Sequence, residues 1–232
     1  MSEVRGARAL VVGASGVLGT ATARALQDAG ARLVVTGRDA DRLAALDDVT
    51  EAALELDLLD VDACRAAVEQ AADHLGGLDL VVVASGVAGF GSAAETPDAV
   101  VEELFAVNTL GPIAVLAASV PRLGKGGTLV VLSAILADAP MAGMAAYSAS
   151  KAGLSAYVAA LRREVRRQGL TVLDVRPPHM ETGLADRAVA GSPPPLPAGH
   201  DVDAFVALLV EGIRTDAREL VWDPAAKALA LR

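Results

Sequence analysis

Short runs of valine and leucine alternate along the chain with longer, alanine-rich stretches in which apolar residues recur at helical spacing. Runs that are apolar at nearly every position are typical of strands buried on both faces, and amphipathic stretches between them are typical of helices. The pattern predicts strands at Ala9–Val12, Arg32–Thr36, Ala52–Leu56, Asp79–Ala84, Thr128–Ser133, Leu170–Val175 and Glu219–Trp222. It predicts helices at Val17–Ala29, Ala40–Leu46, Val61–Leu75, Pro97–Leu123, Met144–Gln168 and Asp201–Ile213, with a kink or boundary at Gly111-Pro112.

This order of elements predicts an α/β fold, a doubly wound parallel sheet with helices on both faces. We expect a single domain over residues 1–232, because no linker-like composition precedes residue 183. The proline-rich stretch Ser192–Gly199 is followed by only about 33 residues, too few for a second core. We interpret residues 183–200 as a loop that covers the substrate.

Composition narrows the classes of protein that fit this pattern. Hydrophobic residues make up 53% of the chain, which excludes intrinsic disorder. The net charge of −9 argues against a nucleic-acid partner, because gripping a phosphate backbone needs a basic surface. No apolar run reaches the roughly 18 residues of a membrane span, and no Cys/His pair has zinc-ligand spacing, so we expect no membrane and no metal. A lone cysteine, Cys64, suits a reducing cytoplasm and predicts a buried small side chain.

Three glycines, Gly13, Gly16 and Gly19, follow the first predicted strand and open the first helix. Glycine permits a tight turn there and lets backbone N–H groups approach a pyrophosphate, whose charge the helix N-terminus favours. This context predicts dinucleotide binding, with a merely structural turn as the alternative. The residues expected to contact the dinucleotide here are Gly13, Ser15, Gly16, Val17, Leu18 and Gly19.

The end of the second strand indicates which dinucleotide binds. A chain specific for NAD usually places an acid there for the ribose 2′-hydroxyl, but this chain has Gly37 followed by Arg38. A guanidinium can pair with a 2′-phosphate, so we favour NADP(H) over NAD(H), with a solvated arginine beside acidic neighbours as the alternative. After the third strand, Asp57 and Leu58 are placed to contact the adenine, although Asp57 could equally cap the next helix.

Tyr147 and Lys151 lie four residues apart near the start of a helix that follows the fifth strand. This spacing puts both side chains on one helix face. An ammonium beside a phenol favours the phenolate, which lowers the phenol's pKa and suits proton exchange with a carbonyl or alcohol oxygen. A surface Tyr/Lys pair without a role is the alternative.

Taken together, these residues resemble the short-chain dehydrogenase/reductase family, whose members are NAD(P)-dependent oxidoreductases with a Rossmann fold. The resemblance covers essentially the whole chain and also includes Asn108 and the segment 177–182. It implies hydride transfer between a nicotinamide and a carbonyl/alcohol pair, with Tyr147 as general acid and Lys151 holding the nicotinamide ribose. Asn108 would anchor a water that links Lys151 to solvent. Further cofactor contacts are implied for Ala84, Ser85, Gly86, Pro177 and Thr182.

The chain departs from the family pattern at three places. The usual Asn-Asn-Ala-Gly after the fourth strand is here Val83-Ala84-Ser85-Gly86, and the usual Pro-Gly after the sixth strand is Pro177-Pro178. The position of the family's catalytic serine, thirteen residues before the tyrosine, is Ala134. Either the neighbouring Ser133 replaces that serine, which we favour because the strand ends there, or the hydroxyl is missing. In the second case His179 or Asp138 could compensate.

These features favour an NADPH-dependent reductase of ketones or aldehydes, or the reverse reaction, acting on a small molecule in an apolar pocket. Because of Ala134, two alternatives stay open: a non-redox enzyme of the same fold (isomerase, lyase or cyclase), or a dinucleotide-binding regulator with impaired catalysis. The helices around Leu104–Leu123 and Ala145–Gln168 carry small residues on long faces. The resemblance implies that such a pair packs across a two-fold axis in a homodimer or homotetramer.

Overall fold

The computed structural model describes residues 3–232, and its centre is one eight-stranded sheet in the order β3-β2-β1-β4-β5-β6-β7-β8. The strands are β1 (Arg8–Val12), β2 (Arg32–Gly37), β3 (Ala52–Glu55), β4 (Leu78–Val83), β5 (Leu123–Leu132), β6 (Thr171–Val175), β7 (Glu219–Asp223) and β8 (Ala228–Leu231). All neighbouring pairs are parallel except β7 with β8. The order reverses between β1 and β4, as in a doubly wound sheet.

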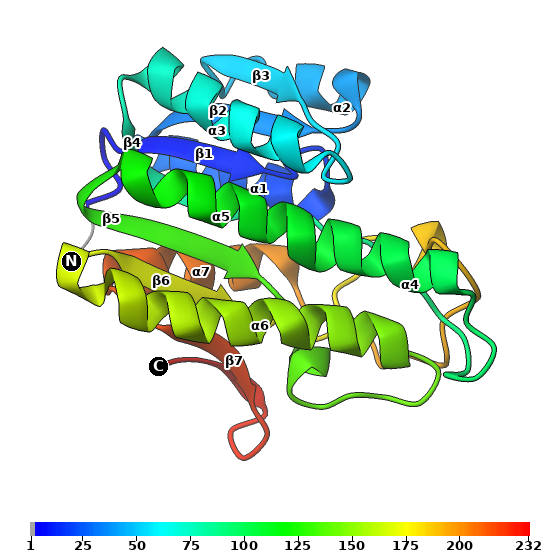
Figure 1. Cartoon of the computed structure of the whole chain (residues 1–232). Coiled ribbons are helices and arrows are strands. Elements are labelled where there is room, and N and C mark those ends of the chain that lie inside the picture. Colours follow the sequence, from blue (N-terminus) through cyan, green and yellow to red (C-terminus); the bar gives the residue numbers. More distant parts are fainter. Residues whose placement is uncertain (1–2) are drawn as a thin grey trace.

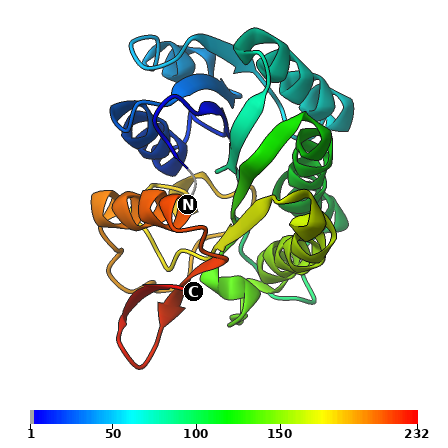
Figure 2. The same ribbon diagram turned by 90° about the vertical axis from the view of Figure 1, so that its left-hand side faces the viewer.

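Helices cover both faces of this sheet (Figures 1 and 2). They are α1 (Val17–Asp28), α2 (Ala40–Ala44), α3 (Val61–Leu75), α4 (Asp98–Phe105), α5 (Gly111–Ser119), α6 (Ala145–Val165) and α7 (Val202–Arg214). Figure 2 shows α1 and α7 on one face and α3, α5 and α6 on the other. The fold class predicted from the hydrophobic pattern is therefore confirmed.

Each face of the sheet has its own hydrophobic core. Alternate residues of β5 divide between the two: Leu129 and Val131 pack toward α5 and α6, and Val130 and Leu132 pack toward α7. Cys64 is fully buried in the first of these cores, as expected of a small apolar side chain. Because both faces are covered, the strands must be apolar at nearly every position, which is why their pattern was readable.

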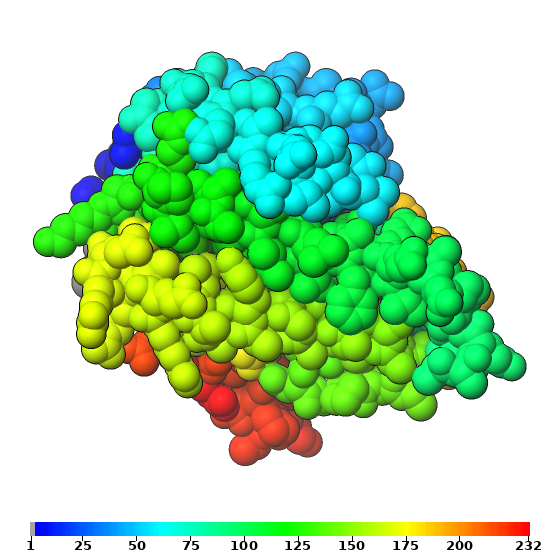
Figure 3. Space-filling view, in the orientation of Figure 1, coloured from blue at the N-terminus to red at the C-terminus, as the bar shows by residue number. Residues whose placement is uncertain are grey.

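Three features of the architecture differ from the predicted elements. The predicted helix Pro97–Leu123 is divided by a π-helical segment, η1 (Ala106–Leu110), and a short 3-10 turn (Val120–Arg122) ends it before β5 begins at Leu123. An eighth strand, β8, forms an antiparallel hairpin with β7, so the sheet is mixed rather than wholly parallel. The hairpin turn protrudes from the molecule in the space-filling view (Figure 3).

The run Asp98–Arg122, which contains α4, η1 and α5, is long and apolar enough to cross a membrane, with a mean hydropathy of 1.7. However, 56% of its most apolar window is buried inside the protein. It packs between α3 and α6 against the sheet (Figure 1). Its apolar character is thus accounted for by a place in the core.

Candidate active site

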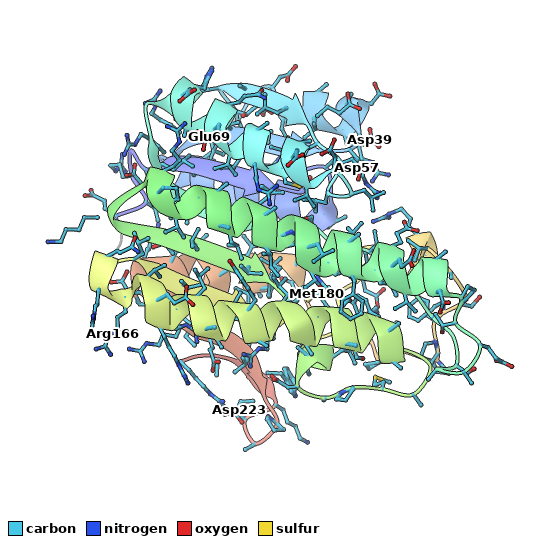
Figure 4. All side chains as sticks on the ribbon, in the orientation of Figure 1. Asp39, Asp57, Glu69, Arg166, Met180 and Asp223 are labelled. Carbon is cyan, nitrogen blue, oxygen red and sulfur yellow. The ribbon has the colours of Figure 1, made fainter. Side chains whose placement is uncertain are left out.

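A cleft of about 1040 Å³ lies at the carboxyl edge of the sheet, beside the point where the strand order reverses. Figure 4 shows Asp39, Asp57 and Met180 toward this edge, whereas Glu69 and Arg166 lie toward the opposite one. Of the residues predicted to form the site, all but Gly19 and Asn108 line this cleft. Parallel strands bring their carboxyl ends to one edge, so side chains far apart in sequence meet there.

The glycine turn forms one end of the cleft. The amides of Gly13 and Ala14 donate to the Thr36 carbonyl at 2.9 and 2.8 Å, which ties the turn to β2. Gly13 has a φ of +86°, and a Cβ at Gly19 would collide with the Gly13 carbonyl, so both positions require glycine. Helix α1 begins after Gly16 with no side-chain cap and no acid in its first turn. Its first amides are therefore open to an anion.

Beyond the glycine turn, the ends of β2 and β3 supply charged groups. Asp39 accepts from the Arg42 amide and pairs with the Arg42 guanidinium at 3.2 Å, so its charge is already engaged. Arg38 is exposed at the cleft, and no hydrogen bond or ion pair holds it within residues 3–232. Its guanidinium is therefore available to an anionic partner.

Asp57 also lines the cleft, and its carboxylate accepts from the Leu59 amide at 3.0 Å. The N-terminal cap of α3 is Asp60, whose carboxylate accepts from the amides of Asp62 and Ala63. The interpretation of Asp57 as the helix cap is therefore wrong. Its role at the cleft stays a prediction.

Tyr147 and Lys151 form the wall of the cleft from the first two turns of α6, and both are almost fully buried. Burial raises the pKa of Tyr147 to about 12, because the phenolate loses its solvation. Burial also lowers the pKa of Lys151 to about 8, and the negative charge of Asp174 opposes this effect. The expected lowering of the Tyr147 pKa by Lys151 is therefore wrong here, because burial raises this pKa instead.

Asn108 lies behind this wall, within the π-helical segment η1. Its side chain accepts from the Val87 amide and donates to the Val87 carbonyl, both at 2.9 Å, and it also donates to Ser150 Oγ at 3.0 Å. A Cβ at Gly86 would come within 2.9 Å of Lys151 Nζ and 3.1 Å of Asn108 Oδ1. Glycine at this position therefore lets the ammonium and the amide approach the loop after β4.

Ser133 does not take the place of the missing catalytic serine. Its hydroxyl donates to Asp174 Oδ1 at 2.5 Å, in the space between β5 and β6. Ala134, the next residue, lines the cleft and packs in the same core cluster as Tyr147. Our preference for Ser133 is thus corrected: both residues line the cleft, but the Ser133 hydroxyl is engaged by a buried carboxylate and Ala134 presents only a methyl group. The sequence could not reveal this, because Asp174 lies 41 residues away.

The other end of the cleft is mostly apolar. It is lined there by Phe90, Leu136, Met141, Met144, Leu184, Leu196, His179, His200 and Trp222. His200 and Trp222 stack edge to face, with ring centroids 4.8 Å apart. We did not predict these two residues as part of the site, although Trp222 ends a predicted strand at the same sheet edge, which was the available signal.

The two groups proposed to compensate for the lost hydroxyl have different positions. Asp138 does not line the cleft, and its carboxylate pairs with Arg176 at 2.9 Å. His179 does line it, with Nε2 3.5 Å from Glu181 Oε1. The segment 183–200 also borders the cleft and is tied to the loop after β4, since the Val189 amide donates to the Ala88 carbonyl at 2.8 Å.

No group of three or more His, Cys, Asp or Glu side chains within residues 3–232 is arranged to hold a metal ion. The site thus combines a glycine turn, the exposed and unpaired Arg38 and the buried pair Tyr147 and Lys151 along one cleft.

A family model described as short chain dehydrogenase matches residues 7–192. The chain belongs to the short-chain dehydrogenase/reductase family.

Individual members of this oxidoreductase family support the assignment. An uncharacterised oxidoreductase of Myxococcus xanthus is 35% identical over 226 residues, which is 94% of this chain and 88% of that one. The structure of a short-chain oxidoreductase from Thermus thermophilus is 37% identical, has a TM-score of 0.76, and matches 88% of this chain and 95% of its own. A short-chain dehydrogenase of Burkholderia cenocepacia, in complex with NADP, is 29% identical with a TM-score of 0.81 and 91% coverage of both chains.

Proposed function

We propose that this short-chain dehydrogenase/reductase catalyses NADPH-dependent reduction of a ketone or aldehyde, or the reverse oxidation of an alcohol. The observation that carries the proposal is the buried Tyr147/Lys151 pair, which borders the same cleft as the glycine turn. The apolar far end of the cleft suits the carbon skeleton of a small molecule. In this proposal Tyr147 is the proton donor, between the end of the cleft that suits a dinucleotide and the apolar end that suits a substrate.

The residues along the cleft fit a nicotinamide dinucleotide. The open amides of α1 suit its pyrophosphate, and Arg38 suits a 2′-phosphate. Ser85 Oγ is buried beside Gly13 and has no hydrogen-bond partner within residues 3–232. A buried hydroxyl without a partner is costly, so a ligand that bonds to it would recover that cost. The NADP complex of the Burkholderia relative adds support for the phosphorylated cofactor.

When bound, NADPH would supply the hydride that reduces the carbonyl carbon. Tyr147 would donate its phenolic proton to the carbonyl oxygen as that oxygen becomes negative. Its high pKa keeps the phenol protonated at neutral pH, which is the form a reduction needs. The Lys151 ammonium would stabilise the phenolate left behind, and the apolar lining would exclude water.

The methyl group of Ala134 favours a second candidate function, that of a dinucleotide-binding protein without redox turnover. A hydroxyl here would supply one more donor to the substrate oxygen, and its absence weakens catalysis by the same logic as a lost oxyanion-hole donor, about 10²–10³ in rate. The retained Tyr147, Lys151 and Asn108 arrangement favours the enzyme.

The deciding experiment follows NADPH consumption with a panel of apolar ketones and aldehydes, for the wild type and for Tyr147→Phe. We expect wild-type turnover and its loss by at least about 10²-fold in Tyr147→Phe, with the Kd for NADPH unchanged. Tyr157→Phe, on the same helix and outside the cleft lining, is the matched control. Tight NADPH binding without turnover on any substrate would instead support the second candidate.

Arg38→Ala tests the cofactor preference within the same assay. Loss of a charge-assisted pair should weaken NADPH binding by about 10-fold or more and leave NADH binding nearly unchanged. Equal effects on the two cofactors would show that Arg38 does not contact the 2′-phosphate.

A further inference from the structure

A buried carboxylate lies on the sheet beneath α6, and the proposed reaction does not use it. Asp174, in β6, is 1% exposed. Its Oδ1 accepts from Ser133 Oγ at 2.5 Å, and its Oδ2 accepts from Arg176 Nε at 3.0 Å. A buried ion of this kind is expensive unless its oxygens are satisfied, and here both are.

The same carboxylate belongs to the surroundings of Lys151. The Lys151 ammonium donates to the Leu132 carbonyl at 3.2 Å, one residue before Ser133. Val131 pairs with Asp174 and Leu132 with Val175 across β5 and β6, so the ammonium and the carboxylate face the same stretch of sheet. Burial lowers the pKa of Lys151, and the charge of Asp174 raises it again.

We propose that Asp174 is a positioning residue for Lys151, whose carboxylate, fixed by Ser133 and Arg176, favours the charged form of the buried ammonium. This inference rests on the proposed function, in which the ammonium stabilises the Tyr147 phenolate. It also gives Ser133 a role that does not involve the substrate.

Several other charged groups face this pair and limit the size of the effect. Arg176 neutralises part of the Asp174 charge and also binds Glu219 and Asp138, at 3.1 and 2.9 Å. Arg162, on α6, also feels the charge of Asp174 while its Nε donates to the Val172 carbonyl. Tyr147, on the helix itself, is neutral because burial raises its pKa. Asp174 therefore contributes the negative charge whose field acts directly on Lys151.

The test measures the titration of Lys151 directly, by NMR of protein labelled with ¹³C and ¹⁵N in lysine. The chain has three lysines, and the other two, Lys125 and Lys227, are exposed and act as internal controls. In Asp174→Asn the titration midpoint of Lys151 should move to lower pH, while those of Lys125 and Lys227 stay fixed. The high-pH limb of the kcat profile should move in the same direction, with KM for the substrate little changed.

Two further variants, Ser133→Ala and Asp174→Glu, are measured in the same way, so that the proposal can still be tested if Asp174→Asn folds poorly. Both retain the negative charge, so each should leave the Lys151 midpoint closer to that of the wild type than Asp174→Asn does. An unmoved Lys151 midpoint in folded Asp174→Asn would overturn the proposal. If the Lys151 midpoint moves as expected in Asp174→Asn but the wild type shows no turnover, the inference about Asp174 stands and the proposed function fails.

Discussion

Burial controls the chemistry of the two central side chains of the site. It moves the pKa of Tyr147 up and that of Lys151 down, which in both cases favours the neutral form. A neutral phenol is ready to donate a proton, but a neutral amine cannot stabilise the phenolate that results. The proposed reaction therefore needs groups that hold Lys151 charged, and the inference above assigns this to Asp174, with the Leu132 carbonyl as the hydrogen-bond acceptor of the ammonium.

Because Lys151 is buried with a low pKa, its charge should destabilise the folded protein near neutral pH. The folded state releases this proton at about pH 8, and the unfolded state retains it until about pH 10.5. The penalty is thus full below pH 8 and fades above it, so it amounts to on the order of 3 kcal/mol at pH 7. We expect Lys151→Met, which removes the charge, to increase the free energy of unfolding at pH 7.

Urea unfolding at pH 7, 8 and 9 checks this prediction. Tyr147 and Cys64, whose pKa values burial raises to about 12 and about 11, act in the opposite direction at higher pH and are common to both proteins. The gap between Lys151→Met and the wild type should therefore change little between pH 7 and pH 8 and narrow from pH 8 to pH 9. A gap that is constant over this range would mean that side-chain packing, rather than charge, separates the two.

Ala134 offers a gain-of-function test at a single residue. Ala134→Ser places a hydroxyl at the cleft wall, near Tyr147, at the cost of burying one polar group. We expect kcat to rise, by up to about 10²-fold, because a second donor then reaches the substrate oxygen. Steady-state kinetics with NADPH measures the effect, and Ala139→Ser, exposed on the same loop and outside the cleft lining, is the control. An equal kcat in all three proteins would place the substrate oxygen elsewhere.

At the scale of elements, the sequence predicted the strands that are buried on both faces. It did not predict elements that depend on contacts between residues far apart in the chain. The central strands β1, β2, β4, β5 and β6 were readable because both faces of the sheet are covered there. The eighth, β8, is a short edge strand of alternating alanine and leucine, a pattern that also fits a helix. The π-helical turn at Asn108 depends on bonds to Val87 and Ser150, which local propensity does not contain.

The glycine turn that begins α1 can be tested by two substitutions of the same kind. A Cβ at Gly19 would collide with the Gly13 carbonyl and lie 2.9 Å from the Ala14 Cα, whereas a Cβ at Gly16 would lie 3.4 Å from the Gly13 carbonyl, an ordinary contact. Gly19→Ala should therefore displace the turn, lower the free energy of unfolding by about 1–3 kcal/mol and weaken NADPH binding. Gly16→Ala should fold with nearly wild-type stability. Chemical denaturation compares the two, and a similar loss in both would mean that flexibility rather than space is required.

At the scale of the whole molecule, the sheet and its two helical layers occupy most of the chain, and the apolar end of the cleft is built from connecting segments. The loop after β4, the turn after β5 and residues 183–200 enclose it, joined by the bond from Val189 to Ala88. Such connections can vary without disturbing the sheet, which is why the fold was predictable and the shape of the apolar end of the cleft was not.

Four large apolar side chains are exposed on the described part of the molecule: Val17, Leu59, Leu110 and Met141. Val17 and Met141 line the cleft, but Leu110, 53% exposed in η1 between α4 and α5, does not. An apolar residue exposed on this helical layer is explained if a second copy of the chain covers it, as we expect of a homodimer or homotetramer. Leu110→Glu should then shift the protein toward a monomer, because a carboxylate would be buried in the interface.

Light scattering during size-exclusion chromatography measures this shift, and dilution of the wild type should give the same monomer at lower concentration. Ala207→Glu, exposed on α7 across the sheet, adds the same charge to the opposite layer and should leave the assembly intact. If both variants keep the wild-type mass, the layer that contains α4 and α5 is not the interface. If the monomeric Leu110→Glu retains turnover, each copy holds a complete site, as the course of the cleft within one chain requires.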